Sequence, residues 1–251
     1  MNKILNKVPA VTLIFWIVKI LATTVGETAA DFLSETLHLG LVGTSYVMGA
    51  VLLIVLFVQF KYKRYIPAVY WLAVVLLSVV GTLISDNLVD NLSISLSTTS
   101  IIFGSALIIV FVIWYVVEKS LSVHTISTTR REFFYWLAIL FTFSLGTSAG
   151  DLIAESSGLG YAYAALLFAG VIALIYAAYK VLKLNAILAF WLAYIFTRPL
   201  GASLGDLLSQ PSKVGGLDLG TTMTSVIFLA TILILVIYLS IQQKKTLADT
   251  K

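Results

Sequence analysis

The sequence contains no cysteine, four prolines, two histidines and only 11% charged residues. The absence of cysteine excludes disulfide bonds, thiolate metal sites and cysteine nucleophiles. The shortage of charge excludes a water-soluble fold, because soluble domains carry roughly 25% charged residues. The two histidines, His38 and His124, are isolated between apolar segments and do not indicate a metal centre.

Apolar side chains, in contrast, make up 60% of the 251 residues, and the mean hydropathy is +1.02. A membrane-spanning helix needs about 20 mostly apolar residues. Runs such as residues 51–58 do not alternate as the strands of a β-barrel would. The first apolar segment follows Lys3 and Lys7 but is longer than the core of a signal peptide, so we assign it to the mature fold. We predict eight spans, at roughly 9–30, 41–60, 66–85, 98–117, 133–152, 161–180, 186–206 and 222–241.

Basic residues collect in alternate connections between these spans. One set of connections and termini holds Lys3, Lys7, Lys61, Lys63, Arg64, Lys119, Arg130, Arg131, Lys180, Lys183, Lys244, Lys245 and Lys251, whereas the opposite set holds only Lys213. By the positive-inside rule we expect a bacterial cytoplasmic (inner) membrane protein with both termini in the cytoplasm. The pI near 9.2 therefore reflects membrane topology, and we expect the lipid bilayer, not nucleic acid, as the partner.

Four segments share one pattern, which is an aromatic residue, tryptophan, nine residues, glycine, four residues and aspartate. The tryptophans are Trp16, Trp71, Trp136 and Trp191, the glycines are Gly26, Gly81, Gly146 and Gly201, and the aspartates are Asp31, Asp86, Asp151 and Asp206. Four residues later come Glu35, Asp90, Glu155 and Gln210. We therefore predict a single all-α transmembrane domain, 1–251, of four two-helix repeats at approximately 9–64, 65–122, 130–183 and 184–245. All four copies share one orientation, so their pseudo-symmetry axis should lie along the membrane normal.

This pattern resembles that of a bacterial membrane family defined by four tandem repeats of unknown function, each with two spans and a characteristic tryptophan. The resemblance covers nearly the whole chain and implies the same topology. It implies no particular activity. Gln210 departs from the acidic residue of the other three copies, so the copies are not equivalent.

On a helical wheel at about 100° per residue, the positions 7, 11, 15 and 19 residues after each tryptophan form one stripe. The four stripes are Thr23, Glu27, Asp31 and Glu35; Ser78, Thr82, Asp86 and Asp90; Phe143, Thr147, Asp151 and Glu155; and Arg198, Ala202, Asp206 and Gln210. Four such stripes could line an outward-facing vestibule whose carboxylates bind a hard metal ion or carry protons. Alternatively, each aspartate ends its span at the headgroups or caps a short interfacial helix. The repeated glycines lie off the stripe and suit close helix contact.

Arg198 lies near the middle of the seventh span, where a charged residue is costly and indicates a functional site. It could form a structural ion pair with an acid such as Glu27, bind an anion, or act as a charge gate. Lys19 is expected to extend its ammonium to the cytoplasmic interface. The tryptophans lie near that boundary, where they would form an aromatic belt or pack between helices.

We expect a transporter or channel for a cation or a proton-coupled small solute. A membrane-embedded scaffold or sensor is the alternative. An enzyme is not expected, because the sequence has no cysteine, no HExxH or GxSxG motif and no histidine within a span. The sequence does not identify a cofactor or an oligomeric state.

Overall fold

The computed structural model describes residues 6–248, apart from the side chains of residues 155, 156 and 246–248. Within this range the chain forms eight long helices and no β-strand, and each helix is long and apolar enough to cross a membrane. The helices are α1 (Leu13–Asp31), α2 (Gly40–Lys61), α3 (Pro67–Asp86), α4 (Leu96–Glu118), α5 (Thr129–Asp151), α6 (Tyr161–Val181), α7 (Ala186–Ser209) and α8 (Gly220–Ala248). The predicted all-α, multi-pass membrane fold is confirmed.

The first helix begins later than predicted, at Leu13 instead of residue 9. The side chain of Thr12 caps it by accepting a hydrogen bond from the backbone N–H of Phe15. The preceding segment is not helical. It folds back to the rest of the protein, where Val8 is buried and the backbone N–H of Lys7 donates to the carbonyl of Ile126 (2.8 Å).

Three of the odd-numbered helices continue beyond their motif aspartate as a single π-helical turn. These turns are η1 (Phe32–Thr36), η2 (Asn87–Asn91) and η4 (Leu152–Ser156). The helical backbone therefore continues for one turn beyond each of these three aspartates. The fourth copy lacks the turn, since α7 ends at Ser209 and Pro211 disfavours helical backbone at Gln210.

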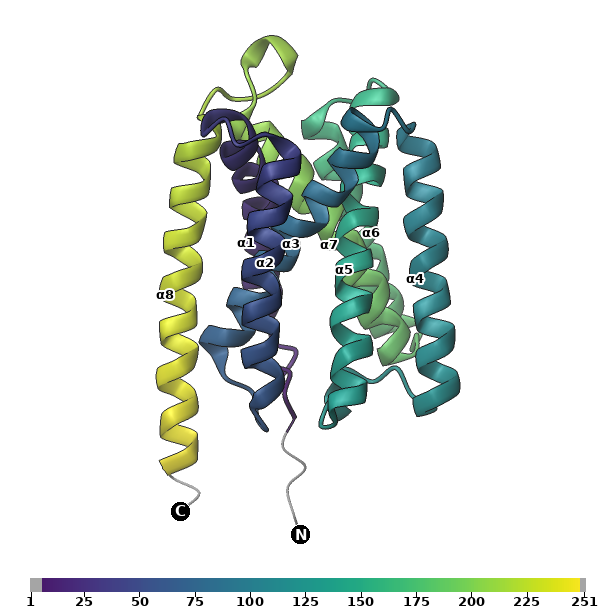
Figure 1. Cartoon of the computed structure of the whole chain (residues 1–251). Coiled ribbons are helices and arrows are strands. Elements are labelled where there is room, and N and C mark those ends of the chain that lie inside the picture. The colour runs from purple at the N-terminus through teal and green to yellow at the C-terminus, as the bar shows by residue number, and fades with distance from the viewer. Residues whose placement is uncertain (1–5, 249–251) are drawn as a thin grey trace.

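The odd-numbered helices form a closed inner ring, because α1 packs against α3 and α7, and α5 packs against the same two helices. Between 56% and 72% of the most apolar window of each odd helix is buried, against 11% to 22% for the even helices, so the even helices form an outer layer. Each even helix packs on the odd helix of the following repeat: α2 on α3, α4 on α5, α6 on α7 and α8 on α1 (Figure 1). The repeats therefore interlock around one axis.

The motif glycines lie where neighbouring inner helices approach most closely. A β-carbon added at Gly81 would lie 2.7 Å from the Cβ of Phe143 and 3.2 Å from the backbone nitrogen of Ser144. The other three interfaces repeat this contact, with Gly26 against Ser78, Gly146 against Arg198, and Gly201 against Thr23. Each glycine thus meets the residue seven positions after the tryptophan of the next copy, which confirms its predicted role in helix contact.

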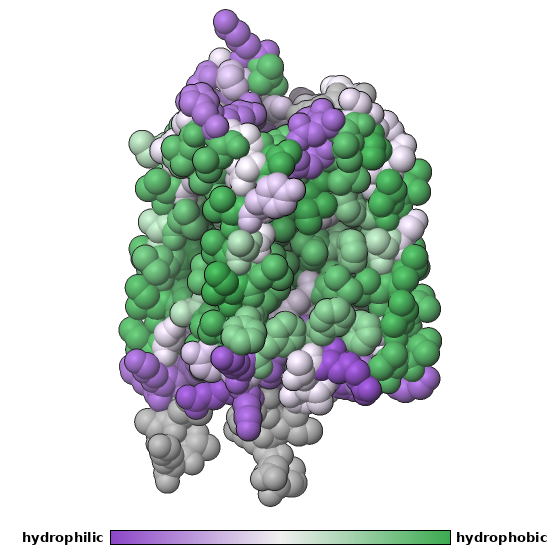
Figure 2. All heavy atoms as spheres, viewed as in Figure 1, coloured by the Kyte–Doolittle hydropathy of each residue, from purple (hydrophilic) through white to green (hydrophobic). Residues whose placement is uncertain are grey.

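The molecule has an apolar band between two polar ends (Figure 2). The described segment before α1 and the end of α8 lie at one of them (Figure 1), together with the connections and helix ends that carry Lys61, Lys63, Arg64, Lys119, Arg130, Arg131, Lys180 and Lys183. We call this the basic end. The opposite end, which we call the acidic end, carries the three π-helical turns and the connection between α7 and α8.

Substituting Gly81 by alanine should destabilise the protein by about 1–3 kcal/mol, because the added methyl group meets backbone that cannot move aside. Thermal unfolding in detergent measures this loss. Gly170→Ala is the matched control, since Gly170 lies in α6 with no heavy atom within 4 Å of an added β-carbon. The control should be neutral or stabilising, because alanine favours a helix. Equal effects of the two substitutions would contradict the close contact.

Candidate functional site

A cavity of about 320 Å³ lies at the acidic end, on the axis of the inner ring. Its lining contains one motif aspartate from every repeat. The residues that line it are Glu27, Asp31, Ser34, Glu35, Gly40, Leu41, Asp86, Val89, Asp90, Leu96, Asp151, Asp206 and Gln210. Residues 120 or more positions apart in the chain thus face one space because the four helices form a ring.

The carboxylates lie at different depths in this cavity. Glu35 and Asp90 are exposed at its rim, on the π-helical turns. Asp31, Asp86 and Asp151 are half-buried, and Asp206 is only 6% exposed. We call these four the aspartate layer. Below them Glu27 is also 6% exposed, so the acidic groups become less accessible with depth.

Three of these carboxylates are close enough to share one cation. Glu27, Asp151 and Asp206 each offer one carboxylate oxygen, and these three oxygens lie within 4.8 Å of one another. Oxygens that bind one Ca²⁺ at 2.3–2.6 Å can be at most about 5 Å apart. The separation and the oxygen-only donor set therefore fit a hard cation.

The floor of the cavity is a hydrogen-bonded network around Arg198, which is fully buried. Its Nη2 donates to Glu27 Oε2 (2.8 Å), to Thr147 Oγ1 (2.7 Å) and to the hydroxyl of Thr82. Its Nη1 donates to the backbone carbonyl of Thr23 (3.0 Å). The predicted ion pair between Arg198 and Glu27 is therefore present, and one guanidinium binds side chains from the other three repeats.

The fourth equivalent position explains how the guanidinium fits. Glu27, Thr82 and Thr147 lie eleven residues after their tryptophans, and the same position in the arginine's own repeat is Ala202. Ala202 is fully buried and has no polar side chain. The small residue leaves space on the axis for the guanidinium of Arg198 one turn below.

Below this network the axis holds a second basic residue, Lys19, whose placement differs from the prediction. Lys19 is fully buried and does not reach the basic end. Its Nζ donates to the backbone carbonyl of Tyr194 (3.3 Å) and lies 4.3 Å from the ring centroid of Tyr194 and 4.7 Å from that of Phe143. The prediction was wrong because Lys19, four residues before Thr23, continues the polar stripe by one turn towards the axis.

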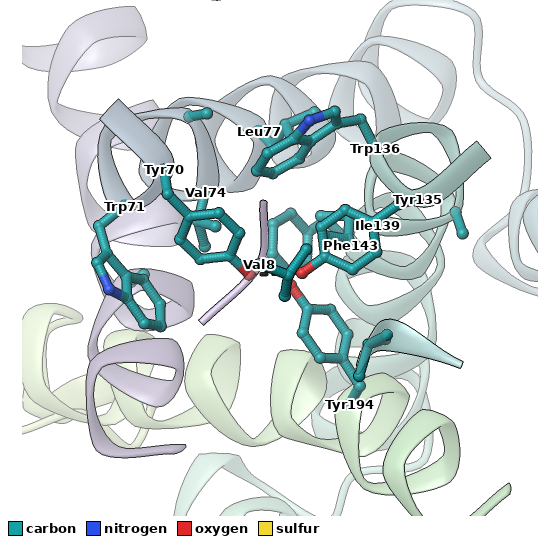
Figure 3. Close-up of a cluster of buried hydrophobic side chains, with 14 of the residues drawn as sticks. Val8, Tyr70, Trp71, Val74, Leu77, Tyr135, Trp136, Ile139, Phe143 and Tyr194 are labelled. Atoms are coloured by element: carbon teal, nitrogen blue, oxygen red, sulfur yellow. Dashed lines mark hydrogen bonds between the residues drawn. The ribbon is translucent and has the colours of Figure 1, made fainter. Parts of the chain in front are cut away.

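Aromatic side chains close the axis towards the basic end. Tyr70, Tyr135 and Tyr194 are fully buried and point their hydroxyl groups towards one another (Figure 3). The hydroxyls of Tyr70 and Tyr135 are 2.5 Å apart. Val8, from the segment before α1, belongs to the same cluster. We call the three tyrosines the tyrosine layer; together with Val8 they separate the cavity and Lys19 from the basic end.

The motif tryptophans pack between helices beside this layer. Trp71, Trp136 and Trp191 are at most 4% exposed. The indole N–H of Trp71 donates to the hydroxyl of Tyr65 (3.0 Å), and that of Trp191 donates to the carbonyl of Leu121 (2.9 Å). The indoles therefore stabilise the ring.

The structure brings together all the site residues suggested by the sequence except one that it does not place. Glu155 has its backbone in η4, but its side chain lies outside the described residues. Sequence reasoning missed Lys19 and the three tyrosines. Extending the stripe to the residues three positions after and one position before each tryptophan would have found Lys19, Tyr194, Tyr70 and Tyr135.

A family model described as Repeat of Unknown Function (DUF347) matches four stretches of the chain, residues 14–65, 69–120, 134–184 and 189–245. Each stretch contains one copy of the tryptophan, glycine and aspartate motif. No curated protein and no solved structure matches the chain.

Replacing Arg198 by alanine should cost about 3–5 kcal/mol of stability, because Glu27 then remains buried without its partner. Adding Glu27→Gln to that variant should recover part of the loss. Arg198→Lys should retain only part of the stability, since lysine lacks the planar fork that reaches several acceptors. Unfolding in detergent provides the measurement.

Lys213→Ala is the control, because Lys213 is exposed in the connection between α7 and α8. It should change stability by no more than about 0.5 kcal/mol. An Arg198→Ala variant as stable as this control would contradict the network.

Proposed function

Since the chain belongs to the family of repeats described as Repeat of Unknown Function (DUF347), whose description names no activity, we propose from the site alone that it transports a cation across the membrane. The observation that carries the proposal is the cavity to which every repeat contributes an aspartate. Carboxylates within a membrane domain are energetically costly, and where they occur they commonly line ion pathways.

The cation would be one that prefers oxygen ligands, such as Ca²⁺, Mg²⁺ or Mn²⁺. Carboxylate and amide oxygens are the available donors, and the close set of Glu27, Asp151 and Asp206 supplies three of them. The rim carboxylates Glu35 and Asp90 would raise the local concentration of cations by attracting them. The cavity serves in this proposal as a binding site for a passing ion, not as a site of catalysis.

A transporter that alternates between two states fits better than an open channel. Below Glu27 the axis is filled by Arg198, Lys19 and the tyrosine layer, all fully buried. An ion could continue only if several of these side chains moved. The described conformation would then be the one that is open at the acidic end and closed at the basic end.

The proposed orientation places the basic end, with both termini, in the cytoplasm of a bacterial cell. The chain has no cysteine, so single introduced cysteines report location without a background. Ser212→Cys, at the acidic end, should react with an impermeant thiol reagent on intact cells. His124→Cys, at the basic end, should react only after permeabilisation; both positions are exposed. The reverse labelling pattern would contradict this orientation.

Cation uptake into proteoliposomes tests the function itself. With Ca²⁺, Mg²⁺ and Mn²⁺ offered separately, at least one should enter faster than into empty vesicles. Asp151→Asn and Asp206→Asn should each reduce that uptake by about tenfold or more, because each removes a charged oxygen ligand. The same variants should lose the thermal stabilisation that the cation gives the wild type, about 2.7 kcal/mol at one hundred times its Kd.

Asp218→Asn is the matched control. Asp218 is exposed at the acidic end and does not line the cavity. It should behave as the wild type does. No uptake of any of the three ions by the wild type, or equal losses in the control, would overturn the proposed function.

A further inference from the structure

Lys19 is a buried amine that makes no ion pair among the described residues. The ion pairs found within that part of the chain join Lys7 to Glu132, Arg130 and Arg131 to Glu118, and Arg198 to Glu27. The Nζ of Lys19 instead contacts one backbone carbonyl and two aromatic rings. These contacts stabilise an ammonium less than contact with a carboxylate would, so the charge of Lys19 is poorly compensated.

The charges near Lys19 on the axis do not balance if it is protonated. Glu27 neutralises Arg198 directly, and the electrostatic effect of Arg198 also reaches Lys19. A protonated Lys19 therefore adds one uncompensated positive charge to a region without water-exposed side chains. Arginine remains charged in proteins, whereas a buried lysine readily exchanges its proton.

Among the described groups near it on the inner helices, Lys19 is the one able to change its charge. Phe143 of α5 and Tyr194 of α7 contact Lys19, and Arg198 of α7 acts on it electrostatically. On its own helix, Glu27 lies two turns above, paired with Arg198. The tyrosine hydroxyls are neutral unless they lose a proton, which in water requires a pH near 10.

We propose that Lys19 carries the proton that this protein exchanges for its cation. This inference rests on the proposed transport function and adds the coupling ion and the residue that carries it. A cation between Glu27, Asp151 and Asp206 and a proton on Lys19 both add positive charge to the same dry axis, so each disfavours the other.

The strength of the competition between the proton and the cation depends on the distance between Lys19 and Glu27, which the helix sets. Lys19 and Glu27 are eight residues apart, or about 12 Å along the axis. At an effective dielectric constant near 20, one unit of charge at that distance changes binding of the proton by about tenfold. A divalent cation would change it by about a hundredfold, which is enough to couple the two events.

The exchange is balanced as follows. In the conformation that faces one side, the ammonium of Lys19 releases one proton to water on that side and the cation binds to the carboxylates. In the conformation that faces the other side, the cation leaves and the neutral amine takes up one proton from water there. One proton thus crosses in the opposite direction to each cation, and no other reactant is needed.

The experiment measures both fluxes in proteoliposomes that contain a pH-sensitive dye, with the membrane potential clamped by potassium and valinomycin. A gradient of the cation that the wild type transports should drive protons the opposite way. Lys19→Met should abolish this proton flux while the cation still stabilises the protein against heat. Lys213→Met, at an exposed lysine, should keep the wild-type coupling.

A second variant and a second readout keep the proposal testable if Lys19→Met does not fold. Between pH 6 and 9 the affinity of the wild type for the cation should rise with pH, because the proton competes with it. Lys19→Gln should show a smaller rise. Lys19→Arg, which keeps a permanent charge, should bind the cation more weakly than the wild type at high pH, where the wild-type lysine is neutral, and should lack the rise with pH.

Four outcomes would overturn the inference. Cation flux in the wild type without counterflow of protons would remove the coupling but leave the transport function standing. Unchanged proton flux in Lys19→Met, or an unchanged pH profile in Lys19→Gln, would remove the role of Lys19. A wild type that moves no cation would overturn the transport function and this inference together.

Discussion

The rest of the structure depends on the hydrogen bonds and the ion pair that hold the two terminal nitrogens of the buried Arg198 guanidinium inside the membrane domain. The core of the bilayer contains no water that could accept hydrogen bonds from the guanidinium, so the protein must supply the acceptors. One acceptor, the carboxylate of Glu27, balances the charge, while Thr82 and Thr147 complete the contacts from the remaining two repeats. The network can form only if the inner helices lie close together, and it separates the open half of the axis from the closed half.

The repeated glycines allow the inner helices to lie close together. The differences among the repeats make the two halves of the axis different. Each glycine places a helix against the stripe of the next copy, so four similar segments present their stripes to one centre. A perfectly symmetric ring would place four equal side chains at each level. Here one level holds a single arginine and the next a single lysine, while only the aspartate level is kept in all four copies. The common element is therefore the cavity lined by carboxylates, and the unique residues form its floor.

The spans, the repeat, the axial stripe and the pairing of Arg198 with Glu27 could be predicted because they follow from apolar run length, helical period and charge. The π-helical turns could not, since a turn with one extra residue has no distinct composition. The packing of each even helix on the next repeat depends on side-chain fit between distant segments, which hydropathy does not describe. The position of Lys19 could not be predicted from the usual tendency of a lysine near the end of a span to extend to the interface, because Lys19 lies on the stripe that faces the axis. The segment that holds Val8 is apolar enough to resemble part of the first span. It is followed by Pro9 and the capping residue Thr12, and the helix begins only after them.

The axis is open at the acidic end down to Glu27 and closed below Arg198. Two valines of the same repeat test it directly, because Val89 lines the cavity and Val74 is fully buried at the level of Lys19. Each is replaced by cysteine in the cysteine-free chain, and the rate of reaction with an impermeant, positively charged thiol reagent is measured from either side of the membrane. Val89→Cys should react rapidly from the acidic end, whereas Val74→Cys should react from neither side in the absence of a transported cation. Equal rates at the two positions, or an unreactive Val89→Cys, would contradict it.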